Sequence, residues 1–80
     1  MKIPFFYWNY RVMRHITDGI ECFAIHEVHY EGVVPVSCTE NNVGAVGNDM
    51  EDLRGALELY RQALDRPVLD YETLKELEAA

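Results

Sequence analysis

The stretch "WNYRVMRHITDGIECFAIHEVHY" (residues 8–30) decides the fold, because two runs rich in aromatic and β-branched residues flank a tight-turn signal. Asp18-Gly19 is a pair that two-residue hairpin loops favour strongly. The sequence therefore predicts two long antiparallel strands, with Thr17 facing Ile20 across the loop.

The register that follows decides which side chains share a face of the sheet. Val12, Ile25 and Phe23 fall on one face, which we take as the core face, whereas a three-residue loop would shift the partners. Counting back from the turn gives the pairs Val12–Ile25, Arg14–Phe23 and His15–Cys22.

A third strand and a connection follow the hairpin. "EG" (31–32) marks a second turn, and "VVPVSCTE" (33–40) predicts a strand, in which Pro35 indicates an edge position or a strand start. "NNVGAVGN" (41–48) contains glycine and polar residues and is typical of a connection.

The clearest element is an amphipathic helix that starts near residue 49. Asn48 with Glu51 forms a plausible capping box, Asp49 is the alternative cap, and Pro67 stops the helix. Apolar residues recur at spacings of three and four and predict one stripe that packs on the sheet. The stripe consists of Met50, Leu53, Leu57, Tyr60 and Leu64, with Ala56 and Ala63 beside them.

The C-terminal stretch "PVLDYETLKELEAA" (67–80) leaves alternatives open. "PVL" fits a short fourth strand, and Asp70 is a good N-cap for a short last helix that either docks or frays. The chain is thus expected to be a single α+β domain over residues 1–80. Its core is a three-stranded antiparallel meander (β-β-β-α) with one helix packed on one face.

Composition limits the function classes. The chain has 80 residues and a formal charge of −7, which disfavours nonspecific nucleic-acid binding. A domain this small is marginally stable alone, so a homodimer is expected. Cys22 and Cys38 make no disulfide framework, and no signal peptide or membrane span is visible. We expect a cytoplasmic protein with reduced thiols, no cofactor and no membrane partner.

Histidine, cysteine and glutamate crowd "CFAIHEVHYE" (22–31), but the pattern predicts no metal site. His26 and His29 are three residues apart on a strand, so they point to opposite faces and cannot share one ion. His15 is predicted opposite Cys22, and a neighbouring histidine can activate a cysteine as its thiolate. The favoured interpretation of both pairs is structural; a thiol- or metal-dependent enzyme built on His15, Cys22 and His26 is the least favoured hypothesis.

The aromatic and basic N-terminal stretch is the candidate binding surface. Four consecutive aromatic residues cannot all be buried within one strand, so some of them should meet a partner or the helix. A protein partner is favoured, and a sheet-based RNA or single-stranded nucleic-acid binder is the alternative. The candidate partner-binding residues are Phe5, Phe6, Tyr7, Trp8, Tyr10, Arg11 and Arg14.

Four stretches resemble a family of small uncharacterised bacterial proteins: "NYRVMRH" (9–15), "AIHEVHYE" (24–31), "LRGALELYRQAL" (53–64) and "PVLDYE" (67–72). That resemblance implies no assigned activity. The order of strands and helix is also similar to HicB-like antitoxin domains, and this second similarity rests on element order only. Together these features predict a small non-catalytic protein-binding module, in one version antitoxin- or inhibitor-like, with no small-molecule substrate identified.

Overall fold

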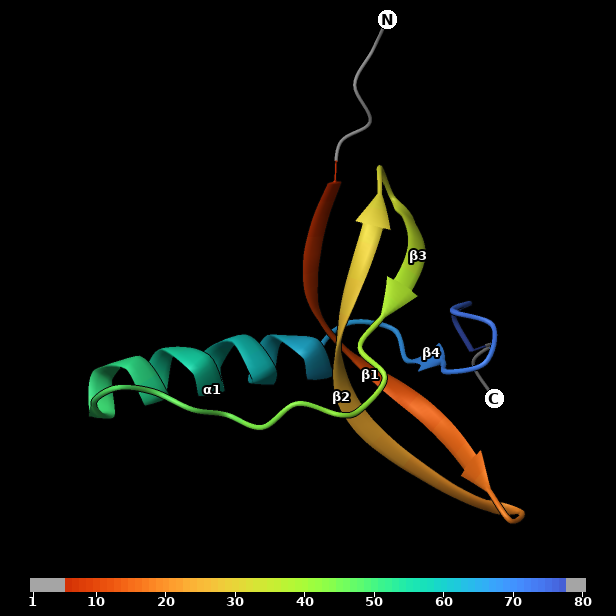
Figure 1. The fold of residues 1–80 in the computed structure, drawn as a ribbon, viewed down its shortest axis with the longest axis horizontal. Helices are drawn as coiled ribbons and strands as arrows, with labels where there is room; N and C mark the ends of the chain where they lie inside the picture. Colours follow the sequence, from red (N-terminus) through yellow and green to blue (C-terminus); the bar gives the residue numbers. More distant parts are fainter. Residues whose placement is uncertain (1–5, 78–80) are drawn as a thin grey trace, which may run out of the picture.

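A computed structural model describes residues 6–77 and shows an α+β fold, in which one helix accompanies a four-stranded sheet (Figure 1). The strands lie in the order β3-β2-β1-β4, with β4 parallel to β1 and the other neighbours antiparallel. The predicted meander, helix and short fourth strand are confirmed. The elements are β1 (Phe6–Thr17), β2 (Ile20–Glu31), β3 (Val34–Cys38), α1 (Met50–Leu64) and β4 (Leu69–Asp70).

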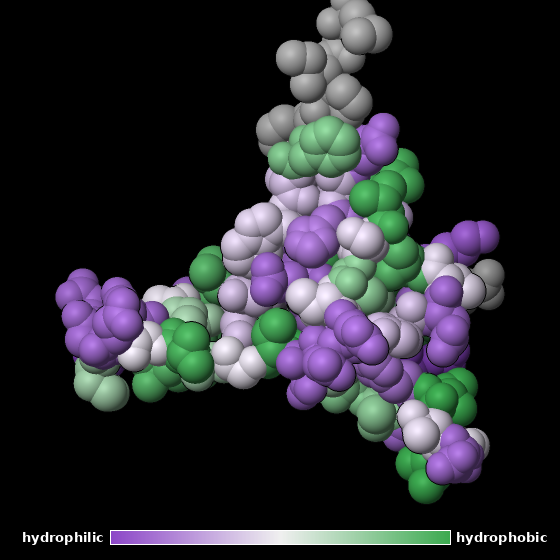
Figure 2. Space-filling model, in the orientation of Figure 1, coloured by the Kyte–Doolittle hydropathy of each residue, from purple (hydrophilic) through white to green (hydrophobic). Residues whose placement is uncertain are grey.

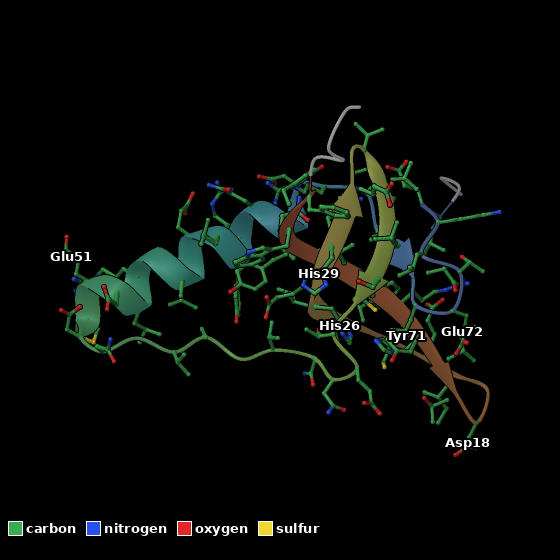
Figure 3. The ribbon with its side chains drawn as sticks, turned by 45° about the horizontal axis from the view of Figure 1, so that its top comes forward. Asp18, His26, His29, Glu51, Tyr71 and Glu72 are labelled. Carbon is green, nitrogen blue, oxygen red and sulfur yellow. The ribbon has the colours of Figure 1, made fainter. Side chains whose placement is uncertain are left out.

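The turn between β1 and β2 fixes the register of the sheet. Asp18 and Gly19 both have positive φ, 53° and 78°, as a two-residue type I′ loop requires. Thr17 therefore pairs with Ile20, and every predicted pair up to Val12–Ile25 is confirmed. The two strands form a long twisted hairpin whose tip carries Asp18 (Figures 1 and 3).

Strand β3 lies at one edge of the sheet, as its proline indicates. Pro35 pairs with Tyr30, next to a shift of register between His29 and Tyr30. An edge strand tolerates proline because one side of its backbone needs no ladder hydrogen bond.

Helix α1 begins at its aspartate cap. The Asp49 side chain accepts a hydrogen bond from the Asp52 backbone N–H at 2.8 Å, so Asp49 is the cap and the Asn48 alternative is wrong. Figure 1 shows that the helix projects from the middle of the hairpin, with its C-terminal end on the sheet and its N-terminal end far from it.

Gly47 sits too close to the first turn of α1 for any side chain. A Cβ built there would lie 2.4 Å from the Leu53 backbone nitrogen and 2.9 Å from the Asp52 carbonyl carbon. We expect Gly47→Ala to displace the connection and destabilise the chain by about 1–3 kcal/mol, as overpacking does. Gly44→Ala is the control, because a Cβ at Gly44 meets nothing within 4 Å. Equal urea midpoints for the two variants would contradict this account.

The two faces of the sheet are covered by different parts of the chain. Strand alternation places Met13, Val28 and Tyr30 on one face, where Leu69 of β4 completes the buried cluster. We call this the C-terminal face, because residues 67–77 cover it. The opposite face, which α1 contacts, is called the helix face.

The expectation that Val12, Ile25 and Phe23 form the core is correct only in part. All three lie on the helix face, where Val12 is buried and Ile25 half-buried, but Phe23 remains 55% exposed. The largest fully buried side chains lie on the other face, because the C-terminal segment folds back onto it. That long-range contact has no local sequence signal.

The predicted helix stripe is also exposed more than expected. Met50, Leu57 and Leu64 are 60%, 51% and 67% exposed, whereas the buried helix residue is Ala63. The helix contacts the sheet near its C-terminal end, through the buried Ala63 and through Tyr60, which meets Tyr10 of β1. Its N-terminal half extends beyond the sheet (Figure 1).

A C-terminal helix does not form in the described residues up to 77, so that expectation is wrong. Asp70 does cap one turn, with Leu74 N–H donating to Asp70 O, but Leu74 has a φ of 61° and ends it. The chain then returns beside β4, where Asp70 N–H donates to Lys75 O and Leu77 N–H to Val68 O. Backbone pairing with β4 therefore replaces helix propagation.

Candidate functional site

The polar residues of the candidate site lie in successive rows across the strands. Arg11, His15 and His26 are on the C-terminal face, whereas Arg14, at the edge of the sheet, is on the helix face. In the first row Arg11 is 7% exposed, and its guanidinium donates to the Tyr30 hydroxyl and to the Pro67 carbonyl, each at 2.7 Å. Glu76 lies 3.8 Å away. Arg11 therefore links β1, β2 and the segment after α1, and its charge is directed into the chain.

The second polar contact joins β1 to β4 at the edge of the sheet. Arg14 Nη2 donates to Asp70 Oδ2 at 2.8 Å, and Glu21 lies 3.6 Å from Arg14 Nη1. Asp70 Oδ1 accepts from the backbone N–H groups of Glu72 and Thr73. Arg14 and these N–H groups lower the pKa of Asp70.

The Asp70 carboxylate makes the stability of the fold depend on pH in the acid range. A carboxyl group whose pKa is depressed in the folded state contributes stability above its ordinary pKa, near 4, and loses it as the pH falls through the folded value. We expect Asp70→Asn to weaken the chain at neutral pH and to reduce the loss of stability below pH 4, while keeping the turn acceptor. Melting temperatures followed by circular dichroism from neutral to acid pH test this, with Asp18→Asn at the hairpin tip as control. Parallel curves for wild type and Asp70→Asn would contradict it.

The third row is a histidine pair stacked on a tyrosine. His15 Nε2 lies 2.8 Å from His26 Nε2, and His26 Nδ1 lies 3.0 Å from the Thr39 carbonyl oxygen. The Tyr71 ring stacks on His15 at a centroid distance of 4.2 Å and lies tilted 5.4 Å from His26. Figure 3 shows Tyr71 beside His26, while His29 lies elsewhere on the same strand.

A cavity of about 350 Å³ opens beside the histidine pair. The Tyr71 hydroxyl closes one side of it by donating to the Glu40 carbonyl at 3.1 Å. Besides the two histidines and Tyr71, the cavity is lined by Thr17, Cys22, Ala24, Glu40, Asn41 and Asn42. Within residues 6–77, no three metal-ligating His, Cys, Asp or Glu side chains lie close enough together to hold an ion.

The structure places His15 and Cys22 opposite each other, as the register predicts, but the side chain of His15 contacts a different residue. His15 and Cys22 are cross-strand neighbours, yet His15 Nε2 faces His26 and not the thiol. Burial, followed by the neighbouring His15, lowers the pKa of His26 and favours its neutral form. The sequence did not predict the His15–His26 contact, because His26 lies four residues along β2 from Cys22, the cross-strand partner of His15.

The other two candidates lie apart from this cavity. His29 is on the helix face, where its Nδ1 lies 3.2 Å from Ser37 Oγ, and it shares no site with His26, as predicted. Cys38 packs against the buried cluster, and burial raises the pKa of its thiol. Such a thiol is a small apolar side chain, not a nucleophile.

The aromatic N-terminal residues are divided between the two faces. Phe5 lies outside the described residues, while Phe6 and Trp8 are exposed on the helix face. Tyr10, on the same face, meets Tyr60 of α1 edge-on at 4.5 Å. Tyr7 stacks on Tyr30 at 4.5 Å on the C-terminal face.

Exposed apolar residues gather on the helix face and on α1 itself. Met50, Leu57 and Leu64 follow one another at intervals of seven, so they lie on one flank of the helix. Figure 2 shows apolar residues, in green, at several places on one side of the molecule, among them the projecting helix and the end of the hairpin. The helix covers only the middle of the helix face and leaves both ends open, with these large apolar residues exposed: Phe6, Trp8, Ile16 and Phe23.

Comparisons with protein-family models, with curated proteins and with solved structures find no match for this chain. Function must therefore be inferred from the geometry. No helix in residues 6–77 is long and apolar enough to cross a membrane. Three of the stretches that carry the resemblance, "NYRVMRH", "AIHEVHYE" and "PVLDYE", meet on the C-terminal face through the Arg11 and His15 contacts.

Proposed function

We propose that this chain is a non-catalytic protein-binding module whose helix face is covered by a second copy of the chain. The observation that carries the proposal is the apolar flank of α1, which the chain itself leaves uncovered. A projecting helix of 15 residues has marginal stability in water unless its apolar face is buried.

The amount of exposed surface supports an obligate partner. The chain exposes 6164 Å², whereas a compact monomer of 9.3 kDa exposes about 5,000 Å². Its radius of gyration of 14.0 Å likewise exceeds the value of about 12 Å expected for a compact domain of this length. Large apolar side chains of α1 and the hairpin contribute to this exposed surface, among them Trp8, Phe23, Leu57 and Leu64.

A second copy fits this surface because the helix pattern suits self-pairing. Apolar residues at spacings of three and four, from Met50 to Leu64, form the seam that two helices bury against each other. A two-fold symmetric pair would also bring Phe23 and Leu64 of each copy, which line one shallow pocket, under cover. An antitoxin- or inhibitor-like role then requires the dimer to bind a further protein, for which the net charge of −7 favours a basic surface.

Nucleic acid is the weaker alternative, because the two arginines that it needs are engaged within the chain. Arg11 and Arg14 donate to Tyr30, Pro67 and Asp70 and approach Glu76 and Glu21. Phosphate binding would have to break these contacts.

Light scattering on size-exclusion peaks tests the proposal. We expect wild type to elute with the mass of a dimer and Leu57→Glu to elute as a folded monomer, because a carboxylate cannot be buried in the seam without a partner. Gln62→Glu is the matched control: it adds the same charge on the side of α1 away from the seam and should remain dimeric. A monomeric wild type, or a dimer that Leu57→Glu leaves intact, would refute the proposed assembly.

A further inference from the structure

The cavity on the C-terminal face contains a pair of ring nitrogens that the proposed protein-binding role does not use. His15 Nε2 and His26 Nε2 lie 2.8 Å apart at the wall of a cavity of about 350 Å³. We propose that these two nitrogens form a two-histidine site for a divalent transition metal of the zinc class.

The first argument is the orientation of His26. Its Nδ1 lies 3.0 Å from the Thr39 carbonyl oxygen, which only accepts hydrogen bonds, so Nδ1 carries the proton. In the neutral ring the lone pair is then on Nε2, the atom that faces His15. A backbone carbonyl that fixes the tautomer in this way is the usual outer-shell partner of a metal-binding histidine.

The second argument is the distance between the two nitrogens. Zinc binds histidine nitrogen at about 2.0–2.1 Å, and a tetrahedral ion therefore separates two ligand nitrogens by about 3.3 Å. The observed separation is 2.8 Å, and the two rings are stacked, with centroids 4.8 Å apart and planes 28° from parallel. To bind one ion the rings must therefore part by about half an ångström and turn until both lone pairs meet at it. The proton that His15 Nε2 donates in the metal-free pair moves to Nδ1 or is released when the metal replaces it.

The third argument is the room beside the pair. Tyr71 stacks against the rings, while the cavity borders Cys22, Glu40 and Asn41. Two histidines leave two positions of a tetrahedral ion open, and this cavity has space for water or a small ligand there. Imidazole nitrogens select zinc, copper and nickel over magnesium and calcium.

Isothermal titration of the untagged, metal-free chain with Zn²⁺ tests the site, and native mass spectrometry gives the stoichiometry. We expect one ion per chain, with binding reduced at least tenfold in His15→Ala. His29→Ala is the matched control, because His29 lies on the same strand but on the opposite face, and it should bind as wild type does.

His26 is buried, so its replacement endangers folding. His15→Gln, at a half-buried position, is therefore the second variant, and circular dichroism must show it folded. Absence of binding in folded wild type, or equal affinity in wild type and the His15 variants, would overturn the proposal and leave only a histidine–histidine hydrogen bond. Magnesium at the same concentration should not bind.

Discussion

Leu69→Ala is expected to destabilise the chain by about 2–5 kcal/mol, the range for a leucine removed from a packed core. Leu69 is fully buried, and it packs with Met13, Val28 and Tyr30 as part of β4. A two-residue strand has almost no stability of its own, so the loss should also release the C-terminal segment from the sheet.

Urea unfolding at one fixed protein concentration measures this loss, because the stability of a dimer depends on concentration. Val33→Ala is the control, since Val33 is exposed in the turn before β3, and it should change the free energy of unfolding by less than about 0.5 kcal/mol. If Leu69→Ala behaves like Val33→Ala, residues 67–77 do not complete the core as described.

Arg11→Met is expected to cost about 2–4 kcal/mol. Methionine keeps an apolar stem but leaves the Tyr30 hydroxyl and the Pro67 carbonyl without the donor that each has now. A buried polar group left unsatisfied costs about 1–3 kcal/mol.

A double-mutant cycle separates this cost from lost packing. Tyr30→Phe removes the hydroxyl that Arg11→Met leaves unsatisfied, so the double variant should be no less stable than Arg11→Met alone. Strictly additive losses in chemical unfolding would show that the hydrogen bond does not couple the two residues.

Local signals in the sequence predict the strands, the turn and the helix well. Asp18-Gly19 sets the loop and hence each cross-strand pair, and Asp49 is the helix cap because its carboxylate reaches a free backbone N–H. The core face was predicted only in part, for a different reason. Alternation shows which side chains share a face but not which segment covers that face, and residues 67–77 cover the side opposite Val12.

The candidate site is less predictable for the same reason. His15 and Cys22 were recognisable as neighbours because both follow from the hairpin register. The pairing of His15 with His26 depends on side-chain rotamers, and the stacking on Tyr71 depends on the return of the chain beside β1. The charge of Arg11 similarly suggested a binding surface. In the structure, however, two hydrogen bonds hold its guanidinium inside the chain, against Tyr30 and Pro67.

The central claim is that a second copy covers the apolar flank of α1. An isotope-filtered nuclear Overhauser experiment on a mixture of labelled and unlabelled chains tests it directly, because it detects only contacts between copies. We predict intermolecular contacts to the methyl groups of Met50, Leu57 and Leu64. A spectrum without such contacts at a concentration where the chain is folded, or contacts confined to the C-terminal face, would contradict the claim.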